Sequence, residues 1–94
     1  MKSREELLKS SEYWKVEIQI QLFNLFDNYL IKNNMSRTDF SQKNNISKKL
    51  ISDILGGDFN GSLSKFVELC LIVGKVPTIK FVNIETILEE DKLL

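Results

Sequence analysis

The sequence predicts an all-α domain, a compact bundle of about five helices with one short β-strand near the C-terminus. Apolar residues recur at spacings of three and four through most of residues 1–74, which is the period of helices that bury one face. Ser or Asn residues stand where these segments begin, and Asn or Gly where they end, as is typical of helix caps. Only residues 78–82 alternate. A chain of 94 residues fits one domain.

The N-terminal part, residues 1–34, is expected to hold two helices. Ser3 and Glu6 have the spacing of a capping box, which predicts a short helix that ends near residue 10. A second, long helix should end at Asn33-Asn34, because Asn tolerates the left-handed conformation that ends helices. Its core-facing stripe is Ile18, Leu22, Leu25, Phe26, Tyr29 and Leu30.

Residues 36–57 predict two short helices joined by a tight turn. Ser36 caps the first helix, and Phe40 is its main apolar anchor. Asn45 stands where the turn needs a residue that can adopt a positive φ, and Ser47 caps the second helix. The second helix carries the apolar residues Leu50, Ile51, Ile54 and Leu55 and ends at Gly56-Gly57.

Residues 58–76 are expected to form a loop and a supporting helix. The helix begins at Ser62 or Ser64 and ends at Gly74. Its apolar positions are Leu63, Phe66, Val67, Cys70, Leu71 and Val73.

The last part, residues 77–94, changes period after its only proline, Pro77. Residues 78–82 are rich in β-branched side chains and alternate, which predicts a short strand. Asn83 is placed to cap a last amphipathic turn or two through Ile84, Ile87 and Leu88.

The composition argues against several classes of protein. A hydrophobic share of 43% with 28% charged residues is ordinary for a folded chain. With no histidine and one cysteine, Cys70, the chain offers no disulfide framework, no ordinary zinc site and no histidine-based catalysis. We therefore expect a binding domain and not an enzyme, with no cofactor and no metal. The N-terminus lacks an apolar signal segment and no stretch is long enough to span a membrane, which predicts a cytoplasmic protein.

Charge is balanced in total but not along the chain. Residues 1–31 carry four basic and five acidic side chains, residues 32–57 five and two, and residues 58–94 four and six, so their net charges are −1, +3 and −2. A basic middle between acidic flanks either faces a polyanion or is an ordinary fluctuation.

Two short helices locked together by Ile46, Ile51 and Ile54 meet the requirement of a helix-turn-helix, whose second helix projects its polar side into the DNA major groove. At these residues the sequence resembles the Cro/C1-type helix-turn-helix family, or Xre family, which includes small phage repressors and HigA-type antitoxins. The match runs from Ser36 to Gly57 and more loosely through Gly74. Phe40-Ser41 stands for the family's leucine–alanine, Asn45-Ile46-Ser47 for glycine–valine–serine, Ser52 for a later serine and Leu55-Gly56-Gly57 for the ending. The chain departs from the pattern at Asn44, where the family has an apolar residue, and at Asp53, an acid on the recognition helix.

The resemblance implies which residues meet DNA. The base-reading residues would be Lys48, Lys49, Ser52 and Asp53, all on the second helix of the motif. The phosphate-binding residues would be Arg37, Lys43, Ser47, Asn60 and Lys65. Each also has a plainer interpretation as a solvated surface side chain.

The implied activity is sequence-specific binding of double-stranded DNA by a homodimer on a palindromic operator, as a transcriptional regulator and most simply a repressor. The strand at residues 78–82 and the apolar turn after it could pair with their copy in a second chain, and the long N-terminal helix is a second candidate for the dimer contact. Alternatively, the strand could pack on its own domain. Two alternatives remain: a HigA-like antitoxin that also binds a toxin protein, and a protein-interaction module that keeps the fold without binding DNA.

Overall fold

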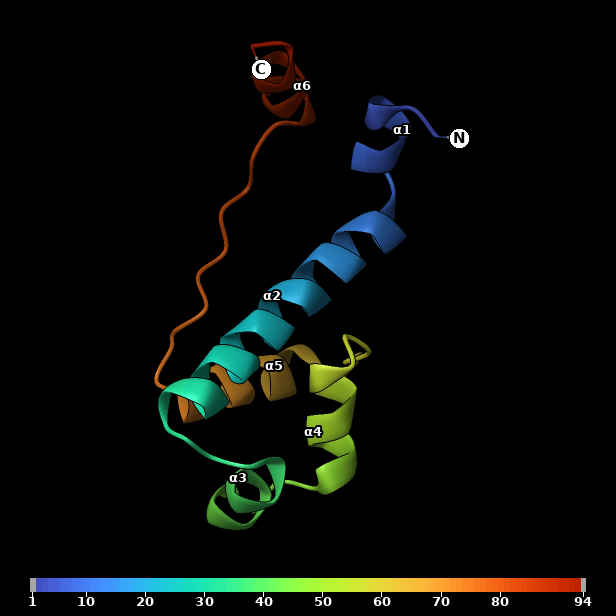
Figure 1. Cartoon of the computed structure of the whole chain (residues 1–94). Helices are drawn as coiled ribbons and strands as arrows, with labels where there is room; N and C mark the ends of the chain where they lie inside the picture. Colours follow the sequence, from blue (N-terminus) through green and yellow to red (C-terminus); the bar gives the residue numbers. More distant parts are fainter. Residues whose placement is uncertain (1, 94) are drawn as a thin grey trace.

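The computed structural model describes residues 2–93, and this part of the chain is all helical, with six α-helices and no strand (Figure 1). Their bounds are α1 Arg4–Leu8, α2 Ser11–Lys32, α3 Arg37–Asn44, α4 Lys48–Leu55, α5 Leu63–Ile72 and α6 Ile84–Lys92. The number of helices is thus one above the predicted five or so, because the last turn or two is a helix of nine residues.

The core lies where the C-terminal half of α2 meets α3, α4 and α5. Phe26 of α2 and Phe40 of α3 are fully buried, and their rings meet edge to face with centroids 5.5 Å apart. Ile51 and Ile54 of α4 and Leu69 of α5 complete this centre. The apolar residues at helical spacing therefore pack α3 and α4 against α2. The opposite face of α4 is exposed to solvent.

The serine caps lie close to where the sequence predicts them, whereas the Asn83 side chain makes no capping hydrogen bond to α6. The Ser3, Ser10, Ser36, Ser47 and Ser62 hydroxyls each accept a hydrogen bond from a backbone N–H in the first turn of the helix that follows. Of the two candidates for the start of α5, Ser62 is the cap. The reciprocal capping box is at Ser36 and Asp39, whereas Ser3 accepts its bond from the Glu6 N–H without a return bond.

The molecule is elongated, with principal extents of 46 × 23 × 22 Å. The N-terminal half of α2 projects from the core, and α1 and α6 lie together at its far end (Figure 1). Arg4 ties these two helices: its Nε lies 2.8 Å from Asp91 Oδ2, and its Nη1 donates to the Tyr13 hydroxyl at 3.0 Å. Bonding to Asp91, and then to Tyr13, raises the pKa of the Arg4 guanidinium.

The predicted strand at residues 78–82 is not present in residues 2–93. The segment is extended, but it runs along the molecule without a partner strand (Figure 1). The β-branched alternation sets the local backbone shape, whereas a strand also needs a second strand for its N–H and C=O groups. The prediction of a strand within the domain is therefore wrong. The suggestion that this strand packs on its own domain is wrong for the same reason.

Within the same residues, no helix is both long enough and apolar enough to cross a lipid bilayer.

Candidate nucleic-acid interface

Helices α3 and α4 are joined by the three residues Asn45, Ile46 and Ser47. Asn45 adopts the left-handed conformation at φ 52°, which reverses the chain at the end of α3. The Ser41 hydroxyl donates to the Ile46 carbonyl, and the Ile46 N–H donates to the Ser41 carbonyl at 3.1 Å. A small residue at position 41 thus fixes the angle between the two helices through both its side chain and its backbone.

Asn44, where the resemblance expects an apolar residue, is half-buried beside this turn. Its side-chain amide donates to the Phe40 carbonyl at 3.1 Å, one turn back in α3. The buried part of this polar group is satisfied within its own helix, so the departure from the family pattern leaves no buried side-chain polar atom of Asn44 without a partner.

The four predicted base-reading residues share the outward face of α4. Ile51 and Ile54 are buried against the core, and Lys48, Lys49 and Ser52 are exposed on the other side of the helix. Asp53 lies at the edge of that face and is half-buried. Residues 48, 49, 52 and 53 lie on one side of the helix, because positions three and four apart share a face. A flat or grooved partner could therefore contact all four side chains together.

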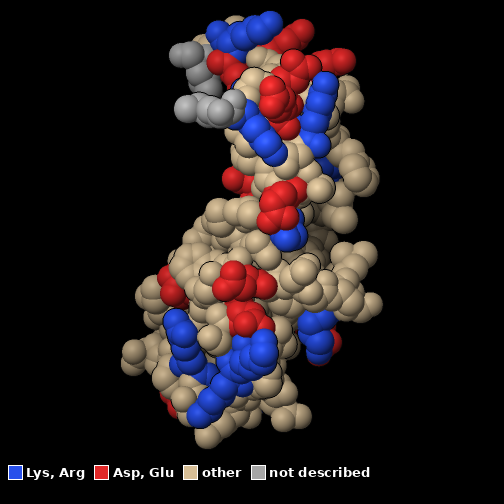
Figure 2. Space-filling view, turned by 90° about the vertical axis from the view of Figure 1, so that its right-hand side faces the viewer, with Lys and Arg blue, Asp and Glu red and all other residues tan. Residues whose placement is uncertain are grey.

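The electrostatics of α4 are unusual for a helix start. Lys48 and Lys49 stand in its first turn, which contains no acidic residue. Cations there oppose the helix dipole by about 0.3–1 kcal/mol each, so the arrangement lowers the stability of α4 in the absence of an anion. In the view of Figure 2, Lys and Arg side chains lie at the end of the molecule that holds α3 and α4, with acidic side chains above them, and further Lys and Arg side chains lie beside acidic ones at the opposite end.

One of the two lysines already has a partner. Lys49 Nζ lies 3.0 Å from Asp53 Oδ2, one turn along α4. The lysine side chain is 84% exposed, so the pair is open to water and worth no more than about 1 kcal/mol. Asp53 therefore both directs Lys49 along the helix surface and lowers the positive charge of the face.

Replacing Asp53 with asparagine is expected to raise the affinity for duplex DNA several-fold. The substitution removes a negative charge that repels the DNA phosphates, and it frees Lys49 from its ion pair. Stability should change by less than about 1 kcal/mol, as for other exposed pairs. Glu85→Gln on α6 is the matched loss of one acid away from this face. A fall in affinity that depends on one base pair would instead show that the Asp53 carboxylate accepts from a cytosine amino group.

The predicted phosphate-binding residues lie in two groups. Arg37 and Lys43 are exposed near opposite ends of α3, which has eight residues. Ser47 is the exposed N-cap of α4, and its oxygen accepts from the Leu50 N–H at 3.1 Å. Its hydroxyl proton remains available for a phosphate oxygen.

Asn60 and Lys65 line a shallow depression beside α4 together with Asp53. Lys65 is half-buried in the first turn of α5, with its Nζ 3.1 Å from Glu68 Oε2. The structure therefore brings Asn60 and Lys65 next to the outward face of α4. Both Lys49 and Lys65 form ion pairs with acidic residues of their own helices.

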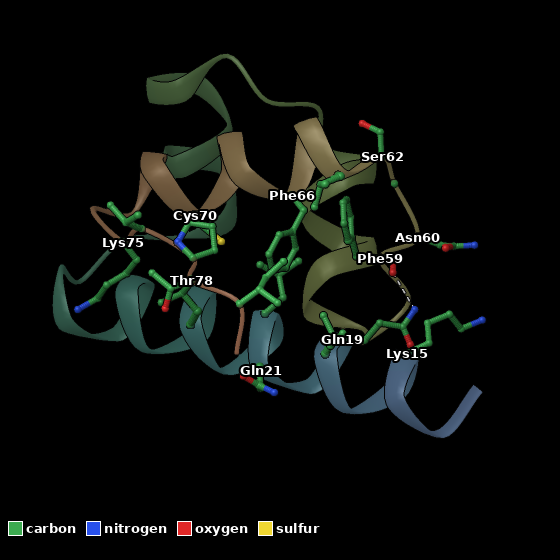
Figure 3. Close-up of a pocket in the computed structure, with 18 of the residues that line it drawn as sticks. Lys15, Gln19, Gln21, Phe59, Asn60, Ser62, Phe66, Cys70, Lys75 and Thr78 are labelled. Carbon is green, nitrogen blue, oxygen red and sulfur yellow. Dashed lines mark hydrogen bonds between the residues drawn. The ribbon is translucent and has the colours of Figure 1, made fainter. Parts of the chain in front are cut away.

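The loop that carries Asn60 is held by a contact that the sequence analysis missed. The Gln19 side-chain amide of α2 donates to the Phe59 carbonyl at 2.7 Å (Figure 3). Phe59 is 9% exposed, and a Cβ on Gly61 would lie 2.7 Å from its ring, so residue 61 must be small. Nothing local signals the Gln19 bond, because 40 residues separate its two ends.

A broader, mostly apolar groove lies between α2, α5 and the extended segment after α5 (Figure 3). Cys70 lies on its inner side, and burial raises the pKa of the thiol, which disfavours the reactive thiolate. Residues 2–93 contain no group of three metal-ligating side chains.

Comparison of the chain with protein-family models, with curated proteins and with solved structures gives no match.

Proposed function

We propose that the protein binds double-stranded DNA sequence-specifically as a two-fold dimer, with α4 in the major groove, and that it regulates transcription by occupying a palindromic operator. Blocking of transcription at that operator is the simplest effect. In this proposal α3 and α4 form the helix-turn-helix of the Cro/C1-type family, which the residues between Ser36 and Gly57 resemble.

The outward face of α4 carries this proposal. Lys48, Lys49 and Ser52 are exposed there, and Ile51 and Ile54 fix the opposite face in the core. Two lysines in the first turn are unfavourable for the helix alone and favourable for a helix whose N-terminal end meets guanine edges and phosphates. Lys is suited to the guanine acceptors O6 and N7, and Ser tolerates any base.

A single copy presents too few contacts for operator specificity. One good base contact discriminates by about 1–3 kcal/mol, whereas specific sites are bound about 4–10 kcal/mol more tightly than other DNA. Two copies related by a two-fold axis double the contacts and require half-sites about one helical turn apart, roughly 34 Å.

A protein-interaction module is the second candidate, and exposed apolar side chains favour it. Ile18 and Ile20 on the projecting half of α2 are 50% and 45% exposed, and Phe81 in the segment after α5 is 92% exposed. Such a surface is typical of a protein contact. The toxin partner of a HigA-like antitoxin would be one occupant of it, and that activity is compatible with DNA binding through α4.

Selection from a random pool of duplex DNA tests the proposal. We expect enrichment of a palindrome whose half-sites are one turn apart, with binding that weakens steeply as salt is raised, by a log–log slope of about −0.9 for each phosphate contact. Failure to enrich any sequence, together with a flat salt dependence, would contradict the proposal and favour the interaction module.

A further inference from the structure

The apolar groove between α2, α5 and residues 75–80 has a volume of about 820 Å³ (Figure 3). Clefts that hold small molecules have volumes of roughly 300–1,000 Å³ and mostly apolar walls. Leu22 and Cys70, both buried, lie on its inner side, and Ile18 and Ile79 line it further out, where they are 50% and 71% exposed. Apolar side chains that face water in a groove favour an apolar occupant.

All the charged side chains that line this groove are lysines. They are Lys15, Lys75 and Lys80, and none of the described residues along the groove is acidic. The composition gives no reason for this bias, because the whole chain has 13 basic and 13 acidic residues. Lysines without a neighbouring acid make a groove attractive to anions. The occupant should therefore be apolar along its length and negatively charged at one place.

The two ends of the groove differ in how far their charge is already neutralised. Figure 3 places Lys15 at one end, and Lys75 and Thr78 at the other. Lys15 Nζ lies 3.0 Å from Glu12 Oε2, one turn back in α2. Within residues 2–93, Lys75 is exposed and forms no ion pair. An anion therefore gains most at the Lys75 end, where the Thr78 hydroxyl offers a second donor.

We infer that the groove binds a free anionic amphiphile with a single alkyl chain, of the class of the medium-chain fatty carboxylates. The carboxylate accepts hydrogen bonds from Lys75 and Thr78. The alkyl chain lies along α2, against Leu22 and Ile18, and covers apolar surface that faces water in the free protein. The site does not use the outward face of α4, so it is independent of the proposed function.

The size of the groove favours one alkyl chain over the helix of a partner protein. Along α2, the residues that line the groove run from Lys15 to Leu25, which is about 15 Å at a rise of roughly 1.5 Å per residue. A helix of this length with its side chains is about 10–12 Å across and fills more space than the groove provides. A single alkyl chain is thin enough to lie within the groove along its length.

Isothermal titration calorimetry of the full chain with decanoate, below the concentration at which decanoate forms micelles, tests the head group. We expect saturable binding at a single site, and no binding of decyltrimethylammonium, whose alkyl chain is the same and whose head group is cationic. Lys75→Gln should raise the dissociation constant about tenfold, because a charge-assisted hydrogen bond is lost. The matched control is Lys9→Gln, at an exposed lysine outside the groove, which should leave the dissociation constant unchanged.

The position of the alkyl chain is tested with Ile18→Asn. This variant should also raise the dissociation constant about tenfold, because the chain loses an apolar contact. Its control is Ile31→Asn, at a residue of α2 that is 71% exposed and does not line the groove. Circular dichroism should show every variant folded, since none of the four residues is in the core.

Absence of a saturable site, equal binding of the cationic amphiphile, or a dissociation constant that neither groove variant changes would overturn the inference. Two other results would overturn it by assigning the groove to another occupant. A dimer in sedimentation equilibrium that Ile18→Asn dissociates and decanoate does not disturb would assign the groove to a second copy. Binding to anionic phospholipid vesicles without binding of free decanoate would assign it to a membrane surface. All these measurements are made without DNA, so their failure leaves the proposed function standing.

Discussion

Replacing Lys48 and Lys49 together with alanine is expected to weaken binding to the selected operator about 100-fold or more. Both side chains are exposed on the outward face of α4, and each contact with a guanine edge discriminates by about 1–3 kcal/mol. The fold should be unaffected, and α4 should become slightly more stable, because two cations leave the positive end of its dipole. Fluorescence anisotropy with the selected duplex and with scrambled DNA measures both affinity and specificity.

The control for this pair of substitutions is Lys9→Ala with Lys15→Ala, which removes the same charge from the far end of the molecule. Lys9 and Lys15 form exposed ion pairs with Glu5 and Glu12, so little stability depends on them. Equal losses of affinity in the two double variants would mean that net charge alone governs binding, and that α4 reads no bases.

Replacing Phe40 with alanine is expected to lower the free energy of unfolding by about 3–5 kcal/mol, the usual cost of removing a buried aromatic ring. Phe40 is fully buried and meets both Phe26 and Tyr29 edge to face, with centroids 5.5 and 5.7 Å away. Its ring anchors α3 to α2. Urea unfolding followed by circular dichroism measures the change.

Leu63→Ala is the comparison for Phe40→Ala, because Leu63 is 70% exposed in the first turn of α5 and should cost less than about 0.5 kcal/mol. A loss below about 1 kcal/mol at Phe40 would show that α3 is not held by this ring. The position of α3 against α2 would then depend on contacts other than the Phe40 ring.

Most of the helical architecture could be predicted because its signals are local. Each serine cap lies within three residues of the N–H that it accepts from, and the left-handed Asn34 and Asn45 and the glycines Gly57 and Gly74 stand next to the helix ends. The outward face of α4 followed from the buried spacing of Ile51 and Ile54. These features depend on the backbone and on one turn of side chains.

The features that could not be predicted depend on residues far apart in the sequence. The alternation in 78–82 gave the extended backbone correctly, but a strand needs a partner that residues 2–93 do not supply. The Arg4–Asp91 tie and the Gln19–Phe59 bond join residues 87 and 40 positions apart. The Lys49–Asp53 pair has the spacing of a helical ion pair, so that contact could have been found from the sequence.

The most direct test of the central claim is a titration of the isotopically labelled full chain with the selected duplex, followed by amide chemical shifts in NMR spectra. The proposal predicts that the largest changes fall on residues 47–53 and on Asn60 and Lys65, with small changes in the extended segment at residues 76–82. Changes confined to α2 and to residues 76–82, with α4 unaffected, would contradict the proposal and would place any partner on the exposed apolar side chains there.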